Sequence, residues 1–205
     1  GQVDIDSIAC PSDICVMSDY STNPVHLAAD VLSQAEHYPR ARVIMVTTSY
    51  RLANAVNDEV ERQLKLLPRE SIARPAIENN SYIAVMDSVE DMFTVMNEVA
   101  PEHLEIQLPD PMGYMSLVQN AGSVFLGAYA SEPLGDYVGG TNHVLPTSGT
   151  ARFSSPLGVY DFVKRTSFTQ FTKERLEEVA THITTLARTD GLEAHARAIE
   201  VRFEK

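Results

Sequence analysis

Two short residue groups in this sequence carry side chains of the kind that bind metals or transfer protons. Gln34 and His37 are three residues apart in a predicted helix, so their side chains project from one face and could hold a single ion. Glu102 and His103 stand at the start of a predicted strand, where a carboxylate and an imidazole could divide acid and base duties if the dipeptide forms a strand terminus or turn. Each pair could instead consist of ordinary polar surface residues, and spacing alone does not decide between a functional site and such a surface.

A third candidate is the glycine-rich segment 135–147, which contains an acid, an imidazole and an amide among glycines that permit close backbone approach. For Asp136, metal ligation and turn capping are both compatible with the sequence. His143 is interpreted as a residue that stabilises the loop with a hydrogen bond, and His195, taken alone, as a surface histidine. Phosphate binding is not indicated, because neither GxGxxG nor GxxxxGK[ST] occurs in the chain.

The elements that must position these residues alternate between short apolar strands and amphipathic helices, which predicts an α/β layered domain with a largely parallel sheet, an incomplete Rossmann-like domain. The predicted strands are 13–18, 42–48, 82–86, 104–108 and 123–126, and the predicted helices are 24–37, 50–67, one after Ser88, and 112–119. From Gly135 the chain reads as a long irregular loop. Helices at 172–188 and 192–203 follow, so we expect an α/β domain at 1–152 and a small, mostly helical carboxy-terminal domain at 153–205.

Composition and charge argue against several classes of protein. The 205 residues carry a formal net charge of −12, which opposes a nucleic-acid binder because such proteins need a basic face. The apolar runs are far shorter than the roughly 20 residues that span a bilayer, and the amino-terminal residues are acidic where a targeting signal would be basic. Only Cys10 and Cys15 are present, and their spacing forms no CxxC motif. We therefore expect a cytoplasmic protein with reduced thiols and neither membrane nor nucleic-acid partners.

Five segments together resemble the histidinol dehydrogenase family. They occur in the family's order along the whole chain: 5–13 (IDSIACPSD), 30–37 (DVLSQAEH), 101–104 (PEHL), 122–127 (GSVFLG) and 140–147 (GTNHVLPT). The resemblance implies oxidation of L-histidinol through L-histidinaldehyde to L-histidine, the last steps of histidine biosynthesis, with two NAD molecules reduced in sequence. It also implies that this chain corresponds to the carboxy-terminal half of the family's chain, so no NAD-binding residue is assigned.

The same resemblance implies roles for individual residues. Zn²⁺ would be bound by Gln34, His37 and Asp136, and by His195 from the partner subunit of a homodimer whose active site is shared. Most of this site would lie in the α/β domain 1–152, and the domain 153–205 would serve in dimerisation. His103 would be the general base, and Glu102 would activate the water that hydrates the aldehyde. The substrate-binding set implied by the family motifs is Ser12, Gln34, His37, His103, Asp136, Asp190 and His195.

Three positions depart from the family pattern. Cys10 stands where the family has glycine, and a side chain there is unfavourable if the backbone needs a positive φ. Asp13 and Asp190 stand where the family has glutamate, which shortens the reach of each side chain. Two alternatives to the leading hypothesis follow: a non-catalytic zinc-binding or oligomerisation module, and a paralogue that oxidises another small amino alcohol or diol.

Overall fold

The computed structural model describes residues 2, 3 and 5–204, and these form two compact units. The first unit is Gly1–Val163 and the second is Lys164–Lys205. The functional division expected after residue 152, with dimerisation assigned to 153–205, stays a prediction.

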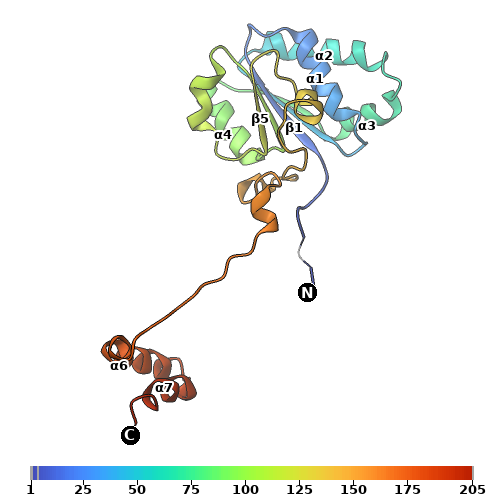
Figure 1. Cartoon of the computed structure of the whole chain (residues 1–205). Helices are drawn as coiled ribbons and strands as arrows, with labels where there is room; N and C mark the ends of the chain where they lie inside the picture. Colours follow the sequence, from blue (N-terminus) through green and yellow to red (C-terminus); the bar gives the residue numbers. More distant parts are fainter. Residues whose placement is uncertain (1, 4, 205) are drawn as a thin grey trace. The chain divides into compact units, whose positions relative to one another are not determined.

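The first unit is an α/β domain built on one five-stranded sheet (Figure 1). The strands are β1 (Asp13–Ser18), β2 (Arg42–Thr47), β3 (Tyr82–Val85), β4 (His103–Gln107) and β5 (Ser123–Leu126). Every pairing is parallel and the order is β3-β2-β1-β4-β5, so the chain reverses its direction of travel across the sheet between β3 and β4. This confirms the predicted α/β class with a parallel sheet.

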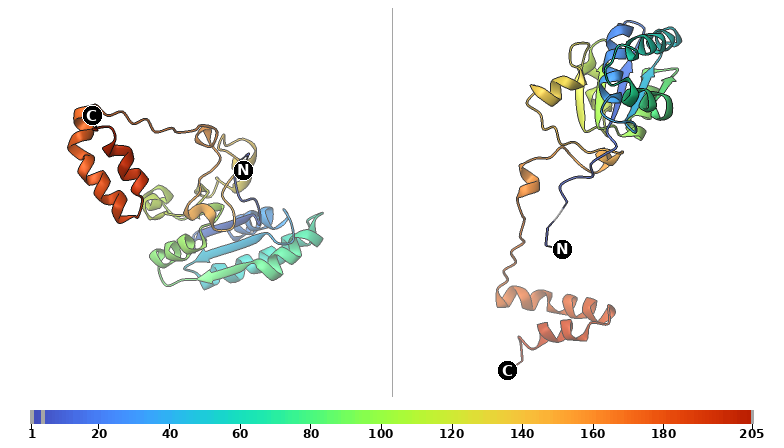
Figure 2. Two further views of the ribbon diagram at one scale, coloured as in Figure 1. Left: turned by 90° about the horizontal axis from the view of Figure 1, so that it is seen from below. Right: turned by 90° about the vertical axis from the view of Figure 1, so that its right-hand side faces the viewer.

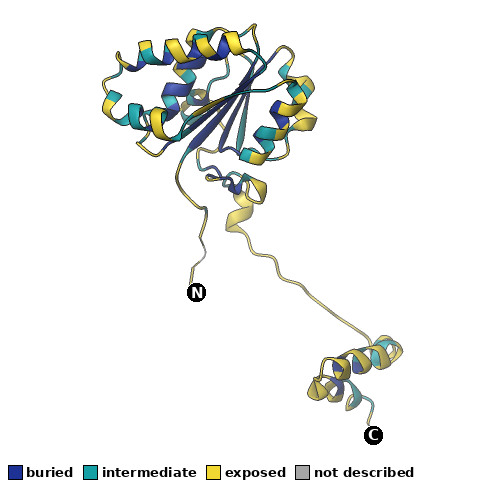
Figure 3. Cartoon of the chain, turned by 180° about the vertical axis from the view of Figure 1, so that it is seen from behind, coloured by how far each residue is buried: buried dark blue, intermediate teal, exposed yellow. Residues whose placement is uncertain are grey.

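Helices cover both faces of this sheet. They are α1 (Pro24–Ala35), α2 (Tyr50–Leu64), α3 (Glu70–Asn80), α4 (Val89–Val99) and the short α5 (Glu132–Tyr137). Alternate residues of β1 point to opposite faces, as strand geometry requires: Ile14 and Val16 pack with α1, α2 and α3, whereas Cys15 and Met17 pack with α4. The views in Figure 2 show the two helical layers, and Figure 3 shows the buried strands in dark blue between them.

One observed helix was not predicted, and two predicted elements differ from the observed ones. The unpredicted helix is α3, which contains Pro75, a residue that is unfavourable inside a helix. Residues Pro111–Leu117 form a 3₁₀ helix where an ordinary helix at 112–119 was expected. An irregular loop was expected to begin at Gly135, but this residue lies inside α5, which extends to Tyr137. Two further 3₁₀ turns, Thr150–Arg152 and Val159–Phe162, lie in the remainder of that irregular segment.

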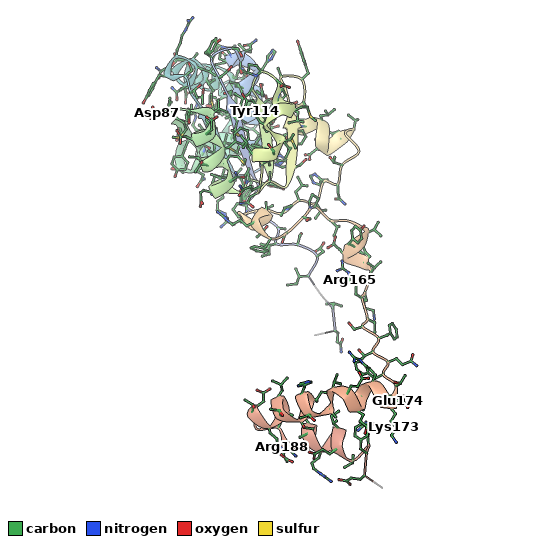
Figure 4. The ribbon with its side chains drawn as sticks, turned by 90° about the vertical axis from the view of Figure 1, so that its left-hand side faces the viewer. Asp87, Tyr114, Arg165, Lys173, Glu174 and Arg188 are labelled. Atoms are coloured by element: carbon green, nitrogen blue, oxygen red, sulfur yellow. The ribbon has the colours of Figure 1, made fainter. Side chains whose placement is uncertain are left out.

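The second unit is a pair of helices, α6 (Lys173–Thr189) and α7 (Glu193–Glu200), which confirms a small, helical carboxy-terminal part. Ala187 and Ala196 are buried between them. Arg188, labelled in Figure 4, forms ion pairs with Glu193 at 2.8 Å and Glu200 at 3.0 Å. Across the described residues of both units, none of the helices is long and apolar enough to cross a membrane.

Candidate active site

Glu102 lies at the amino end of β4, where the parallel neighbour β1 also begins. Its Oε2 accepts a hydrogen bond from Ser12 Oγ at 2.5 Å and another from the Asp13 backbone N–H at 3.2 Å. The Glu102 N–H in turn donates to Asp13 Oδ1 at 2.7 Å, so reciprocal hydrogen bonds join the start of β1 to the start of β4. Burial raises the pKa of the Glu102 carboxyl to about 7. Near neutral pH this group can therefore either give or take a proton.

His103 is buried beside Glu102, and its ring orientation is set by the backbone. Its Nδ1 lies 3.1 Å from the Asp13 carbonyl oxygen. Because a carbonyl oxygen can only accept, the ring hydrogen belongs on Nδ1, and Nε2 is left as the acceptor. Burial lowers the pKa of His103 to about 4, which keeps the imidazole neutral near pH 7. This is the state that a general base needs.

Gln34 reaches the same place from the last turn of α1. The helix is opened by Asn23, whose side chain accepts from the Val25 N–H, and by Pro24 at a position where a helix tolerates proline. Gln34 is fully buried, and its Nε2 donates to Ser12 Oγ at 2.8 Å. Its Oε1 has no hydrogen-bond partner among the described residues. A buried amide oxygen without a partner is costly, and a cation would satisfy it.

His37, Glu132 and Asp136 form a compact cluster of potential ligands. One donor atom from each residue lies within 4.8 Å of the others. Asp136 Oδ1 is 2.8 Å from His143 Nδ1. Burial by itself would raise the pKa of Asp136, but its hydrogen bonds, first that with His143, outweigh burial and lower the pKa. Burial raises the pKa of Glu132 to about 8, with the neighbouring Asp136 charge acting in the same direction.

All of these residues except Gln34, which lies behind Ser12, line one pocket of about 390 Å³. Its lining includes Ser12, His37, Glu102, His103, Glu132, Asp136 and His143, together with apolar walls from Ala9, Val144 and Leu145. Glu132 Oε1 is buried without a hydrogen-bond partner in the described part of the chain and lies 3.9 Å from His103 Nε2. The pocket therefore combines a neutral base, a carboxyl that titrates near pH 7 and a group of metal-type donors.

The donor set fits a divalent transition metal. Imidazole nitrogen with carboxylate and amide oxygen suits Zn²⁺ and related ions, and it differs from the thiolate sets of most structural zinc sites. Two of the oxygens, Gln34 Oε1 and Glu132 Oε1, are the partnerless atoms just described. The protein thus offers polar atoms whose burial a metal ion would compensate.

The structure brings together six of the eight residues selected from the sequence. Ser12, Gln34, His37, Glu102, His103 and Asp136 all lie in or directly behind this pocket. Asp190 and His195 belong to the second unit, where Asp190 ends α6 and His195 lies in α7. The roles of all eight residues stay predictions.

Sequence reasoning missed Glu132 and Glu105. Glu132 precedes Asp136 by four residues, a helical spacing that could have been recognised had α5 been expected. Glu105 follows His103 by two residues in a strand, so the two side chains share a face. The site also lies at the amino ends of β1 and β4, whereas ligands of open α/β sheets usually bind at the carboxyl ends of the strands.

Two backbone positions beside the site are constrained. Cys10, at the pocket wall, has φ of 66°, so the cysteine occupies a conformation that favours glycine. Gly135 in α5 packs against Phe125 so closely that an added Cβ would lie 2.7 Å from its ring carbon Cζ. The small residue at 135 is therefore what lets α5, which carries Glu132 and Asp136, approach the sheet.

Comparison with known proteins identifies the family. The family model described as Histidinol dehydrogenase matches residues 1–203. This chain belongs to the histidinol dehydrogenase family. It is 64% identical over 204 residues to a histidinol dehydrogenase of Lactiplantibacillus plantarum, covering 100% of this chain and 48% of that relative. It is 58% identical to one from Streptococcus mutans, again covering 100% of this chain and 48% of the relative.

A solved histidinol dehydrogenase structure supports the same assignment. The crystal structure from Elizabethkingia anophelis matches with a TM-score of 0.85 and 40% identity, covering 98% of this chain and 46% of that one. The chain thus spans about half the length of the histidinol dehydrogenases that it matches. The resemblance inferred from the sequence motifs is confirmed.

Proposed function

We propose that this chain forms the metal- and substrate-binding half of a histidinol dehydrogenase, which oxidises L-histidinol through L-histidinaldehyde to L-histidine with NAD as oxidant. The observation that carries the proposal is the convergence of Glu102, His103 and the His37–Glu132–Asp136 cluster on one pocket. Family membership supports the substrate and the reaction class. The proposal implies that the protein acts in the cytoplasm as a biosynthetic enzyme.

The acid–base chemistry follows from the two buried groups. His103 accepts the hydroxyl proton of histidinol at Nε2, since its Nδ1 is committed to the Asp13 carbonyl, while the carbon that bears this hydroxyl gives hydride to NAD. Glu102, with a pKa of about 7, takes a proton from the water that adds to the aldehyde. His103 returns its first proton to the aldehyde oxygen as the hydrate forms. Neutral again, it accepts a second hydroxyl proton from the hydrate as the second hydride leaves for NAD. Burial of both groups keeps bulk water from competing for these protons.

Gln34, His37 and Asp136 would hold Zn²⁺, with His195 of the second unit completing the set across a homodimer. Bound there, the metal would orient the imidazole and amine of histidinol against His103. Ser12 would contact the substrate while it fixes Gln34 and Glu102 through its hydroxyl. Asp190 would contact the substrate from the second unit.

The first test is calorimetric titration of this chain with Co²⁺ and Zn²⁺. We expect one tight site that is lost in His37→Ala and kept in His26→Ala. His26 is a suitable control because it is an exposed histidine in α1, the helix that His37 follows. Equal binding by the two variants, or none by the unchanged chain, would reject the metal site.

The second test separates a substrate half from a zinc-binding module. L-Histidinol is titrated into the metal-loaded chain at protein concentrations where the chain is dimeric, and the same titration is made with the His195→Ala variant. Binding that requires both metal and His195 supports a composite site between subunits. NADH formation after addition of the upstream half of a relative supports catalysis, whereas metal binding with neither histidinol binding nor NADH formation supports the non-catalytic module.

A further inference from the structure

A line of polar side chains, buried except for the half-buried Asp30, connects α1 to α5 behind the pocket. Gln107 Nε2 donates to Asp30 Oδ2 at 2.7 Å and to Glu105 Oε2 at 2.8 Å. Glu105 Oε1 accepts the backbone N–H of Glu132 at 2.8 Å. Glu105 is fully buried and Gln107 nearly so. We call Asp30, Gln107 and Glu105 the α1–α5 bridge.

Glu105 supplies what α5 lacks at its own start. Ser131, the N-cap residue of α5, makes no side-chain capping bond in the described structure, and Pro133 has no N–H to offer. The Glu132 N–H is the first of the unpaired donors at a helix N-terminus. A carboxyl oxygen from the middle of β4 satisfies it, so a strand residue takes the place of a local cap.

The two helices joined by this bridge are those that carry the metal-type donors. Asp30 lies one turn before Gln34 in α1, and His37 follows that helix. Glu132 and Asp136 are in α5. Because α5 has six residues, contacts such as that with Glu105 must hold it in place rather than its own helical propensity.

We propose that Glu105 is a positioning residue: through the α1–α5 bridge it fixes α5 relative to α1 and so preorganises the His37–Glu132–Asp136 cluster. The effect of Glu105 on metal affinity rests on the proposed metal site, whereas its effect on the position of α5 depends only on contacts within the protein. Residues that orient metal ligands commonly affect affinity by 10- to 100-fold.

The first experiment needs no metal. Amide hydrogen exchange of the Glu132 N–H is measured by NMR in the unchanged chain, Glu105→Met and Glu105→Gln. Methionine has a similar length but lacks the acceptor oxygen, whereas glutamine keeps one. We expect exchange roughly fivefold faster or more in Glu105→Met and close to unchanged in Glu105→Gln.

Ile106→Ala is the matched control, because Ile106 is the buried neighbour of Glu105 in β4 but its side chain faces α4. It destabilises the domain without touching the bridge. Unchanged exchange in Glu105→Met, or an equal acceleration in Ile106→Ala at matched stability, would overturn the positioning role.

The second experiment measures Co²⁺ affinity of the same variants. We expect it to fall at least tenfold in Glu105→Met, to recover in Glu105→Gln and to change little in Ile106→Ala. Equal affinity in Glu105→Met and the unchanged chain would overturn the claim that the bridge preorganises the cluster. If the unchanged chain binds no Co²⁺, the proposed metal site fails, and the exchange comparison alone decides whether Glu105 positions α5.

Discussion

The two faces of β4 differ in chemistry although they belong to one five-residue strand. Leu104 and Ile106 face α4 and are fully buried in an apolar cluster with Met92, Phe93 and Met96. The opposite face carries His103, Glu105 and Gln107, which are just as buried and are all polar. We refer to these as the apolar face and the polar face of β4.

The comparison separates what holds the fold from what builds the site. The apolar face gains stability from burial of hydrophobic area and requires only shape and volume. The polar face buries ionisable groups, each of which needs a specific partner to offset its desolvation. Residues on the polar face should therefore affect function and pH dependence more than folding, and those on the apolar face the reverse.

The largest effect is expected from placing a charge on the apolar face. Ile106→Asp would bury a carboxylate among hydrocarbon side chains, and we expect a loss of at least about 4 kcal/mol in the free energy of unfolding, enough to unfold a marginally stable domain. Urea denaturation followed by circular dichroism measures this. Ile106→Val is the control, with an expected cost of about 1 kcal/mol. A native-like denaturation midpoint in Ile106→Asp would contradict the distinction between the faces.

On the polar face, His103→Asn should impair catalysis without unfolding the protein. The asparagine amide can still donate to the Asp13 carbonyl, but it provides no basic nitrogen in place of Nε2. We expect histidinol-dependent NADH formation, measured with the upstream half supplied, to fall by about 10²- to 10⁴-fold. The urea midpoint should stay close to that of the unchanged chain. A large drop in midpoint with activity retained per folded molecule would assign His103 to the fold instead.

The polar face should also make stability depend on pH. Burial raises the pKa of Glu105 and of Glu132 to about 8 and that of Glu102 to about 7, whereas unfolded glutamates titrate near 4.5. Between these values the folded state retains protons that the unfolded state has released, so the free energy of unfolding falls as pH rises from about 4.5 to 8. The expected fall is on the order of a few kcal/mol. His103 acts in the opposite direction, because burial lowers its pKa from 6.5 to about 4, but this contribution is confined to the range below about pH 6.5.

Urea midpoints at pH 5, 6.5 and 8 test this dependence. Glu105→Gln removes one of the three glutamates and should flatten the curve, whereas Ile106→Val should lower it without changing its slope. A midpoint that does not fall between pH 6.5 and 8 would show that the buried carboxyls ionise as readily in the folded state as in the unfolded one.

The sequence predicts the apolar face better than the polar face, for a physical reason. Apolar periodicity is local, so β1, α1 and β2 were predicted with bounds close to those observed. The hydrogen bond from Glu132 to Glu105 joins residues 27 positions apart and depends on the path of the chain, which no local pattern encodes. α5 was missed because Pro133 and Gly135 favour a loop in isolation, although here a tertiary contact and close packing on Phe125 stabilise a helix.

The smallest predicted effect lies outside both faces, at the pocket wall. Cys10 has φ of 66°, a conformation that costs a residue with a Cβ about 1–2 kcal/mol, whereas glycine adopts it freely. Because glycine also loses more chain entropy on folding, we expect Cys10→Gly to raise the free energy of unfolding by only about 0.5–1 kcal/mol. Cys10→Ala is the control, since it removes the thiol but keeps the Cβ, and its urea midpoint should not rise. An equal gain in both variants would attribute the effect to the thiol rather than to the backbone.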